Sequence, residues 1–305
     1  MEALRAAILR TLCFHQAWGY APTQAELFLT LDAGERTDDL GQNDFAITLR
    51  DLLAEGTIAE FQGRLGLADK VESLVQEIRA RDAFQPRKRR RALHVARWLS
   101  RLGGVRLVAL ANTTALGNAR DQGDLDFFVI ARRGTLWITR LLGAGPFKLA
   151  GLLPREGKTR DAVCLSYFVA DDALDLSSHM LQPDDPYFRY WFMSLLPLYD
   201  DGVGQTVWDS NPQIRARHPL AAPWIVPPDF CGQPSCQLPA TSYRWLESLA
   251  RVFQRRWFPS NIRELMNRDT RVIVNDRTLK FHVTDAREKF RAEYYDLCSK
   301  FQIAP

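Results

Sequence analysis

The spacing of apolar residues in the first 70 positions predicts three helices followed by a β-hairpin. In two stretches, apolar side chains recur every three or four residues, which is the spacing of one helix face. These side chains are Leu4, Ile8 and Leu12, and then Phe45, Leu49, Leu52 and Leu53. A helix between them is expected to begin after Thr23, because Thr23 and Glu26 have the spacing of a capping box. Beyond Gly56, two strand-like segments flank Gln62 and Gly63, a pattern typical of a hairpin.

Three helices followed by a hairpin resemble a winged helix, a fold that often binds DNA through its third helix. The third predicted helix, Asn43–Glu55, contains three acidic residues and one basic residue. Because a helix that reads DNA needs cationic contacts to phosphates, we expect the module formed by residues 1–70 to pack or to bind protein. Nucleic acid stays open as a partner of this chain but is not favoured.

Residues 71–180 combine helical and strand-like patterns. A helix is expected over residues 71–101. It carries the basic run Arg87–Arg91, which we expect to be a solvated face. A second helix is expected from Thr135 onward. The predicted strands are Val105–Leu110, the apolar run that follows Asp126, and Ala162–Val169.

Residues 181–305 are expected to form a helical C-terminal domain. The aromatic cluster at Tyr187–Phe192 is more typical of a core than of a base-stacking surface, because large aromatic side chains carry much buried area. The proline-rich segment Pro219–Pro239 predicts a loop or linker. Two later helical faces are expected to pair with each other or to cover the core. They consist of Tyr243, Leu246, Ala250, Phe253 and Trp257, and of Ala286, Phe290, Tyr294 and Leu297.

With 46% hydrophobic and 25% charged residues, the composition is typical of a globular protein. Five Cys in a chain of this length do not suggest a disulfide framework, so we expect reduced thiols and a cytoplasmic location. The net charge of +4 is too small to indicate nucleic-acid binding by itself. The apolar stretch Gly134–Leu153 contains two charges and a proline, so it predicts buried helices, and we expect no membrane partner. Cys231 and Cys236 could supply half of a zinc site, but no second Cys or His pair has matching spacing.

Asp124 and Asp126 are the residues that say most about chemistry. They stand two positions apart at the start of an apolar run, and side chains at such positions of a strand point to the same face. Two adjacent carboxylates repel each other unless a cation lies between them. Hard cations such as Mg²⁺ prefer carboxylate oxygens. A strand-borne pair that holds Mg²⁺ against nucleotide phosphates is typical of phosphoryl transfer.

The stretch around this pair resembles the signature of the DNA polymerase β-like nucleotidyltransferase superfamily. That signature has a hydrophobic strand, a Gly-Ser or Gly-Gly turn, a loop, and Asp-x-Asp on the next strand. Here Val105–Leu110 takes the place of the first strand, and Asn112 and Thr113 stand at the turn. The residues in register with the signature are Ala115, Gly117, Ala119, Asp124 and Asp126. The whole chain is similar to an uncharacterised group of bacterial proteins with a nucleotidyltransferase domain.

The resemblance implies an α+β fold, in which a nucleotidyltransferase core of a small mixed sheet is flanked by helices. A winged-helix-like module would precede this core and a helical region would follow it. The resemblance also implies that Asp124 and Asp126 hold Mg²⁺ or Mn²⁺ together with a third carboxylate. Cys164 or Ser166 stands where the superfamily usually has that third acid, so Asp161 is the best substitute for it.

The resemblance assigns Asn112, Thr113 and Gly117 to the phosphates of a nucleoside triphosphate. The implied activity is Mg-dependent transfer of a nucleoside monophosphate to an acceptor hydroxyl that the sequence does not identify. An alternative is a catalytically impaired nucleotidyltransferase fold that binds a nucleotide, a nucleic acid or a protein partner. A third interpretation is a structural protein in which the Asp pair only begins a strand. The preferred base and the oligomeric state stay open.

Overall fold

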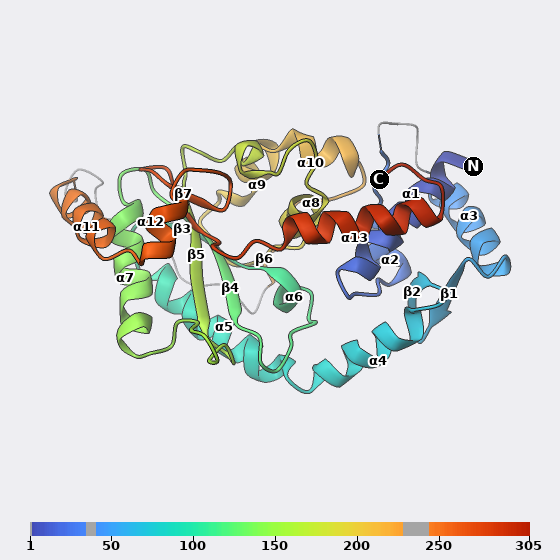
Figure 1. Cartoon of the computed structure of the whole chain (residues 1–305), viewed down its shortest axis with the longest axis horizontal. Coiled ribbons are helices and arrows are strands. Elements are labelled where there is room, and N and C mark those ends of the chain that lie inside the picture. Colours follow the sequence, from blue (N-terminus) through green and yellow to red (C-terminus); the bar gives the residue numbers. More distant parts are fainter. Residues whose placement is uncertain (1, 35–40, 228–243) are drawn as a thin grey trace.

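The computed structural model describes residues 2–34, 41–227 and 244–305 (Figure 1). Its first elements are α1 (Glu2–Ala17), α2 (Gln24–Leu29), α3 (Gln42–Ala54), β1 (Ile58–Phe61) and β2 (Arg64–Leu67). The predicted three helices and hairpin are thus confirmed. So is the capping box, in which Thr23 and Glu26 exchange hydrogen bonds at the start of α2. Gln62 and Gly63 both have positive φ, which suits a tight turn between antiparallel strands.

Two helices connect this N-terminal module to the main sheet, namely α4 (Val71–Asp82) and α5 (Gln85–Ser100). A single helix was expected here. Two helices form because Pro86 lies in the first turn of α5, where it favours a helix start and prevents α4 from continuing. The expectation that the basic run is a solvated face is wrong for Lys88, which is fully buried, although Arg89 and Arg90 are exposed.

In the part of the chain that the structure describes, six strands form one mixed sheet. They are β3 (Val105–Leu110), β4 (Leu125–Ala131), β5 (Val163–Ala170), β6 (Leu196–Asp200), β7 (Val272–Val274) and β8 (Thr278–Phe281). Their order is β6-β3-β4-β5-β8-β7, and β4 and β5 run parallel whereas the other neighbours are antiparallel. The α+β class and the mixed sheet flanked by helices are therefore as predicted.

Both faces of the sheet are covered by helices. The remaining ones are α6 (Asn112–Ala115), α7 (Leu136–Leu149), α8 (Pro186–Met193), α9 (Gly204–Asp209), α10 (Pro212–Arg217), α11 (Arg244–Arg256), α12 (Ser260–Leu265) and α13 (Arg287–Lys300). Strand residues alternate between two cores. Val108 and Leu110 pack with α5 and α7, whereas Leu107 and Ala109 pack with α8, α9 and α10.

The last part of the chain is more than a helical domain, which corrects the prediction for residues 181–305. It contributes β6, β7 and β8 to the sheet, and α13 returns to the N-terminal module (Figure 1). Tyr294 and Leu297 of α13 are buried in the same core as the apolar face of α1. The sequence did not reveal these strands because each has five residues or fewer, too few to display the alternating period of a strand.

Two further expectations concern this region. The aromatic cluster at Tyr187–Phe192 is confirmed as core, since most of its side chains are buried against the sheet or against α1. Cys231 and Cys236 lie outside the described residues, as does much of the proline-rich segment. Among the helices that the structure describes, none has the length and apolar character needed to cross a membrane.

Candidate functional site

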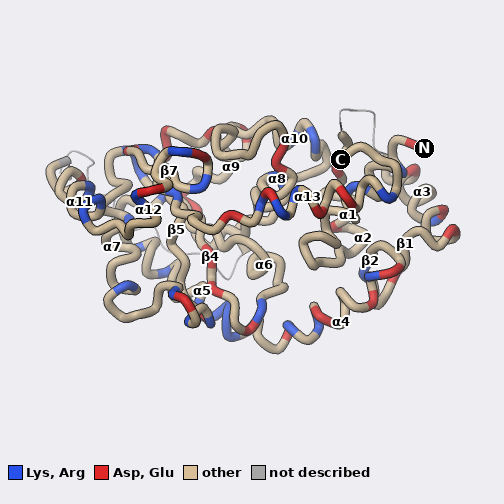
Figure 2. Tube along the Cα trace, in the orientation of Figure 1, with Lys and Arg blue, Asp and Glu red and all other residues tan. Residues whose placement is uncertain are grey.

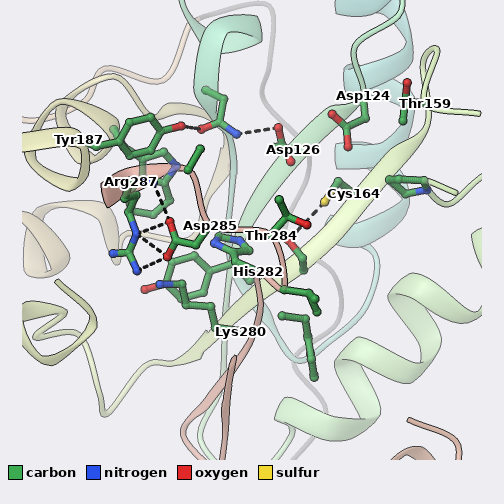
Figure 3. Close-up of a pocket in the computed structure, with 18 of the residues that line it drawn as sticks. Asp124, Asp126, Thr159, Cys164, Tyr187, Lys280, His282, Thr284, Asp285 and Arg287 are labelled. Atoms are coloured by element: carbon green, nitrogen blue, oxygen red, sulfur yellow. Dashed lines mark hydrogen bonds and ion pairs between the residues drawn. The ribbon is translucent and has the colours of Figure 1, made fainter. Parts of the chain in front are cut away.

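Asp124 and Asp126 lie side by side at the start of β4, where the parallel strand β5 brings Cys164 next to them (Figure 3). Asp126 and Cys164 are register partners across these two strands. One ligand atom from each of the three residues lies within 4.8 Å of the others. The two carboxylates thus lie together on one face, as predicted, and the third member of the cluster is the Cys164 thiol.

The local environment raises the pKa of every group in this cluster. Burial, and then the charge of Asp126, raise the pKa of Asp124 to about 6. Burial likewise raises the pKa of Asp126, although hydrogen bonds from Asn112 and Cys164 oppose the shift. Burial and the two carboxylates raise the pKa of the Cys164 thiol well above its usual value. Ionising these groups is therefore unfavourable without a counter-charge, and a bound cation would supply one.

Asn112 holds Asp126 in place from the opposite side. Its Nδ2 donates to Oδ2 of Asp126 at 2.7 Å, and its Oδ1 accepts from the hydroxyl of Tyr187 at 3.0 Å. Asn112 has a φ of 58°, a left-handed conformation that Asn tolerates better than most residues. This chain of hydrogen bonds from α8 through Asn112 fixes the orientation of the Asp126 carboxylate (Figure 3).

Asp161 does not join the pair, which departs from the expectation that it supplies the third carboxylate. It lies in the turn before β5 with a φ of 54°. Its carboxylate forms ion pairs with Nε of Arg87 at 2.7 Å and with Nζ of Lys88 at 3.1 Å. Two cations from α5 therefore already satisfy its charge. Sequence reasoning missed this because it treated the basic run as a solvated helix face.

The carboxylate pair lines a cavity of about 830 Å³, which is within the range of small-molecule sites. One wall comes from the loop at Arg155, Glu156 and Thr159, and another from the aromatic residues of α8. A third wall is formed by Lys280 in β8 and by the segment that leads to Arg287 in α13. The chain therefore builds the cavity from segments that are more than 100 residues apart.

The cationic side chains around this cavity differ in how far they are neutralised. Arg287 donates to Asp185 at 2.7 Å and also pairs with Asp285, so its charge is largely offset. Lys280 donates to the carbonyl of Thr270 at 2.7 Å, and burial lowers its pKa to about 7. Arg155 is exposed at the cavity wall. The positive charge that this cavity offers to an anionic ligand therefore lies mainly on Lys280 and Arg155.

The predicted phosphate-binding residues separate in space. Asn112 lines the cavity, whereas Thr113 and Gly117 are not among its lining residues. Gly117 is exposed and has a φ of 67°, so it serves the turn after α6. Sequence reasoning also did not select Tyr187, Lys280 or Arg155 as site residues. Lys280 lies in Leu279–His282, a stretch similar to the uncharacterised bacterial group, and Tyr187 begins the aromatic cluster that we expected to be core, but only the packing of α8 and β8 beside β4 and β5 places them at the cavity.

The donor set fits a Mg²⁺ ion that takes some of its ligands from water and substrate rather than all of them from the protein. Mg²⁺ is commonly bound by one or two carboxylates, with water and substrate phosphates completing its shell. Asp124 and Asp126 provide these carboxylates, whereas the soft Cys164 thiol is a poor ligand for a hard cation.

Comparisons of the chain with protein-family models, with curated proteins and with solved structures found no match.

Proposed function

We propose that this chain is a Mg-dependent nucleotidyltransferase that moves a nucleoside monophosphate from a nucleoside triphosphate to an acceptor hydroxyl. The observation that carries the proposal is the adjacent, partly buried pair Asp124 and Asp126 in a cavity large enough for a nucleotide. The likeness of residues 105–126 to the superfamily signature supports the same reaction class.

In this proposal Asp124 and Asp126 hold Mg²⁺, which supplies positive charge to offset the charge that develops on the leaving pyrophosphate. Asn112 donates to Oδ2 of Asp126 at 2.7 Å, which restricts the rotation of this carboxylate at the cavity wall. The raised pKa of Cys164 keeps this thiol protonated near neutrality, so it acts as a hydrogen-bond donor beside the pair, with Oγ of Ser166 accepting at 3.3 Å.

The rest of the nucleotide would be bound by two parts of the cavity wall. Lys280 and Arg155 offer positive charge to phosphate oxygens. A phosphate beside Lys280 would favour its charged form and so raise its pKa from about 7. The aromatic side chains of Tyr187 and Trp191 line the same cavity and offer ring surface to a base or sugar. No acceptor is assigned.

The test measures metal and nucleotide binding first and transfer second. Wild type is expected to bind Mn²⁺ and Mg–nucleotide, to release pyrophosphate, and to transfer a label from an α-phosphate to an acceptor in a cell extract. An Asp124→Asn/Asp126→Asn variant is expected to lose both binding and transfer. Asp121→Asn is the matched control, because Asp121 pairs with Arg87 and Arg160 outside the cluster. Equal metal binding by wild type and the double variant would contradict the proposal.

A second candidate is a nucleotide-binding module that has lost catalysis. It is favoured by Cys164, which stands where a third carboxylate would complete a metal site, and by the Asn112 amide that occupies Asp126. This candidate predicts that wild type binds Mg–nucleotide through Asp124 and Asp126 without releasing pyrophosphate. A Cys164→Asp variant would then bind Mn²⁺ more tightly than wild type. Pyrophosphate release by wild type that depends on the Asp pair excludes it.

A further inference from the structure

Helix α11 turns its apolar face away from the protein. Five large apolar side chains on one side of it, including Trp257 directly after its last residue, are 54% to 65% exposed. We call this set the outer stripe, and it consists of Trp245, Leu249, Val252, Phe253 and Trp257. Their spacing of three and four residues places them on one helix face. Of the face that was expected to cover the core, Ala250 is buried as predicted, whereas Phe253 and Trp257 point outward.

Polar side chains on the opposite face attach α11 to α7. The carboxylate of Glu247 accepts hydrogen bonds from the backbone N–H groups of Trp137 and Ile138 at 2.8 and 2.9 Å. Gln254 donates to the carbonyl of Trp137 at 2.7 Å and accepts from Arg140 at 2.6 Å. These bonds are specific to one rotation of the helix. The outward direction of the outer stripe is therefore built into the fold, whereas most helices bury their apolar face.

The charges of α11 have one sign on its accessible surface. Its acidic residue, Glu247, is used at the start of α7. Arg251 pairs with Asp276 at 3.0 Å, and Arg255 and Arg256 are exposed at the end of the helix. Figures 1 and 2 place α11 at one extremity of the molecule, outside α7, with basic positions along it. An extended surface could therefore reach the outer stripe without meeting the other residues that the structure describes.

We propose that α11 lies on a membrane surface that contains anionic lipids, with the outer stripe inserted among the lipids. Amphipathic helices that lie in the membrane interface combine Trp, Phe and Leu on one side with Arg or Lys beside them. Trp245 and Trp257 mark the two ends of the stripe, and Trp is enriched at the level of lipid headgroups. Arg255 and Arg256 supply charge complementary to anionic headgroups.

Nucleic acid and a second copy of the chain fit these observations less well as partners of the outer stripe. Leu249 and Val252 lie in the middle of the stripe, and aliphatic side chains do not stack on nucleic-acid bases as aromatic ones do. Even with about 150–250 Å² taken for each of the five side chains, a range for large aromatic ones, the outer stripe exposes only about 460–760 Å². This is a large patch for a monomer, yet it falls short of the roughly 800 Å² that each partner of a stable dimer buries.

The expectation that the chain has no membrane partner rested on the absence of a spanning segment. A helix that lies in the interface needs no such segment, so the absence of a spanning helix does not bear on this proposal. The proposal is also independent of the carboxylate pair, because the outer stripe is not part of the cavity that Asp124 and Asp126 line.

The test is cosedimentation of the full chain with vesicles of phosphatidylcholine, with and without phosphatidylserine. Wild type is expected to bind the anionic vesicles, and brominated lipids are expected to quench part of its Trp fluorescence. A Trp245→Ala/Trp257→Ala variant is expected to bind more weakly by about tenfold or more, because two large apolar side chains no longer enter the lipid. Trp98→Ala is the matched control, since Trp98 is 39% exposed on α5.

An Arg255→Gln/Arg256→Gln variant is expected to lose affinity for anionic vesicles while binding neutral ones as wild type does. Thermal unfolding of both variants should match wild type, because the changed side chains are exposed. Failure of wild type to bind either vesicle overturns the proposal. Equal binding by wild type and the double Trp variant also overturns it. So does dimerisation or single-stranded nucleic-acid binding that depends on the two Trp residues without any vesicle binding.

Discussion

A buried carboxylate joins the N-terminal module to α8 and α10, and its removal should destabilise the whole chain. Asp32 is fully buried in the loop after α2. Its oxygens accept from Nη2 of Arg189 in α8 at 3.1 Å and from Nε of Arg217 in α10 at 2.9 Å. We consider the substitution Asp32→Asn, which keeps the size of the side chain but removes the charge that both guanidinium groups face.

The expected cost follows from the burial of these partners. Arg189 is 2% exposed and Arg217 is 23% exposed, so the first cannot recover its lost interaction from water. Breaking a buried ion pair on one side costs about 3–5 kcal/mol. We expect the lower end, about 3 kcal/mol, because Arg189 keeps Asp184 as a second partner. For 305 residues this corresponds to a Tm lower by about 5 °C.

The pH dependence gives a second measurement of the same effect. Burial of the Asp32 carboxyl would raise its pKa, but the attraction of His218, Arg189 and Arg217 outweighs burial and holds the pKa below its usual value. A depressed folded-state pKa stabilises the fold above the unfolded-state pKa, which is about 3.9 for Asp. That stabilisation is lost as the pH falls toward the folded-state pKa. The Tm difference between wild type and Asp32→Asn should therefore be constant near neutrality and shrink below about pH 4.

The assay is thermal unfolding followed by circular dichroism across this pH range. Asp184→Asn is the matched control, because Asp184 pairs with the same Arg189 but is 26% exposed, and it should cost less than about 1 kcal/mol. The reasoning would be refuted by an Asp32→Asn variant that melts within about 1 °C of wild type at neutral pH. A Tm difference that stays unchanged in acid would refute the electrostatic origin.

Two further predictions concern the contacts that position α7. Gly104→Ala should lower stability by about 1–3 kcal/mol in urea unfolding, because a Cβ there would overlap the hydroxyls of Thr135 and Thr139. Gly145→Ala in α7 meets no atom within 4 Å and should instead stabilise by about 0.5–1 kcal/mol, so equal effects would contradict the packing argument. Glu247→Gln should weaken the start of α7 by about 1 kcal/mol, seen as faster amide hydrogen exchange in α7 and α11, and unchanged exchange there would contradict the anchoring role.

Several features of this protein followed from short stretches of sequence. The helices and hairpin of the N-terminal module, the capping box at Thr23, and the strand that begins after Asp124 were all predicted. Each depends on residues within about one turn or one strand of each other, where backbone geometry alone relates side chains in space. The adjacency of Asp124 and Asp126 belongs to this group, because two residues of one strand share a face in any fold.

Other features depended on contacts between segments that are distant in the chain. The parallel pairing of β4 with β5 placed Cys164 beside Asp126, and the packing of α5 drew Asp161 to Arg87 and Lys88. No local pattern specifies a strand register or the partner of a charge, because both are set by the arrangement of the whole fold that has the lowest free energy.

The orientation of α11 shows the same division. Its sequence by itself determined an amphipathic helix, since the apolar positions recur with the helical period. Only the tertiary structure decided which face points outward, because Glu247 and Gln254 find hydrogen-bonding partners on α7 and so hold the polar face inward. The hydrogen bonds made by these polar groups, including those to the backbone N–H groups in the first turn of α7, outweighed the free energy of burying the apolar stripe. A periodic pattern carries no information about that balance.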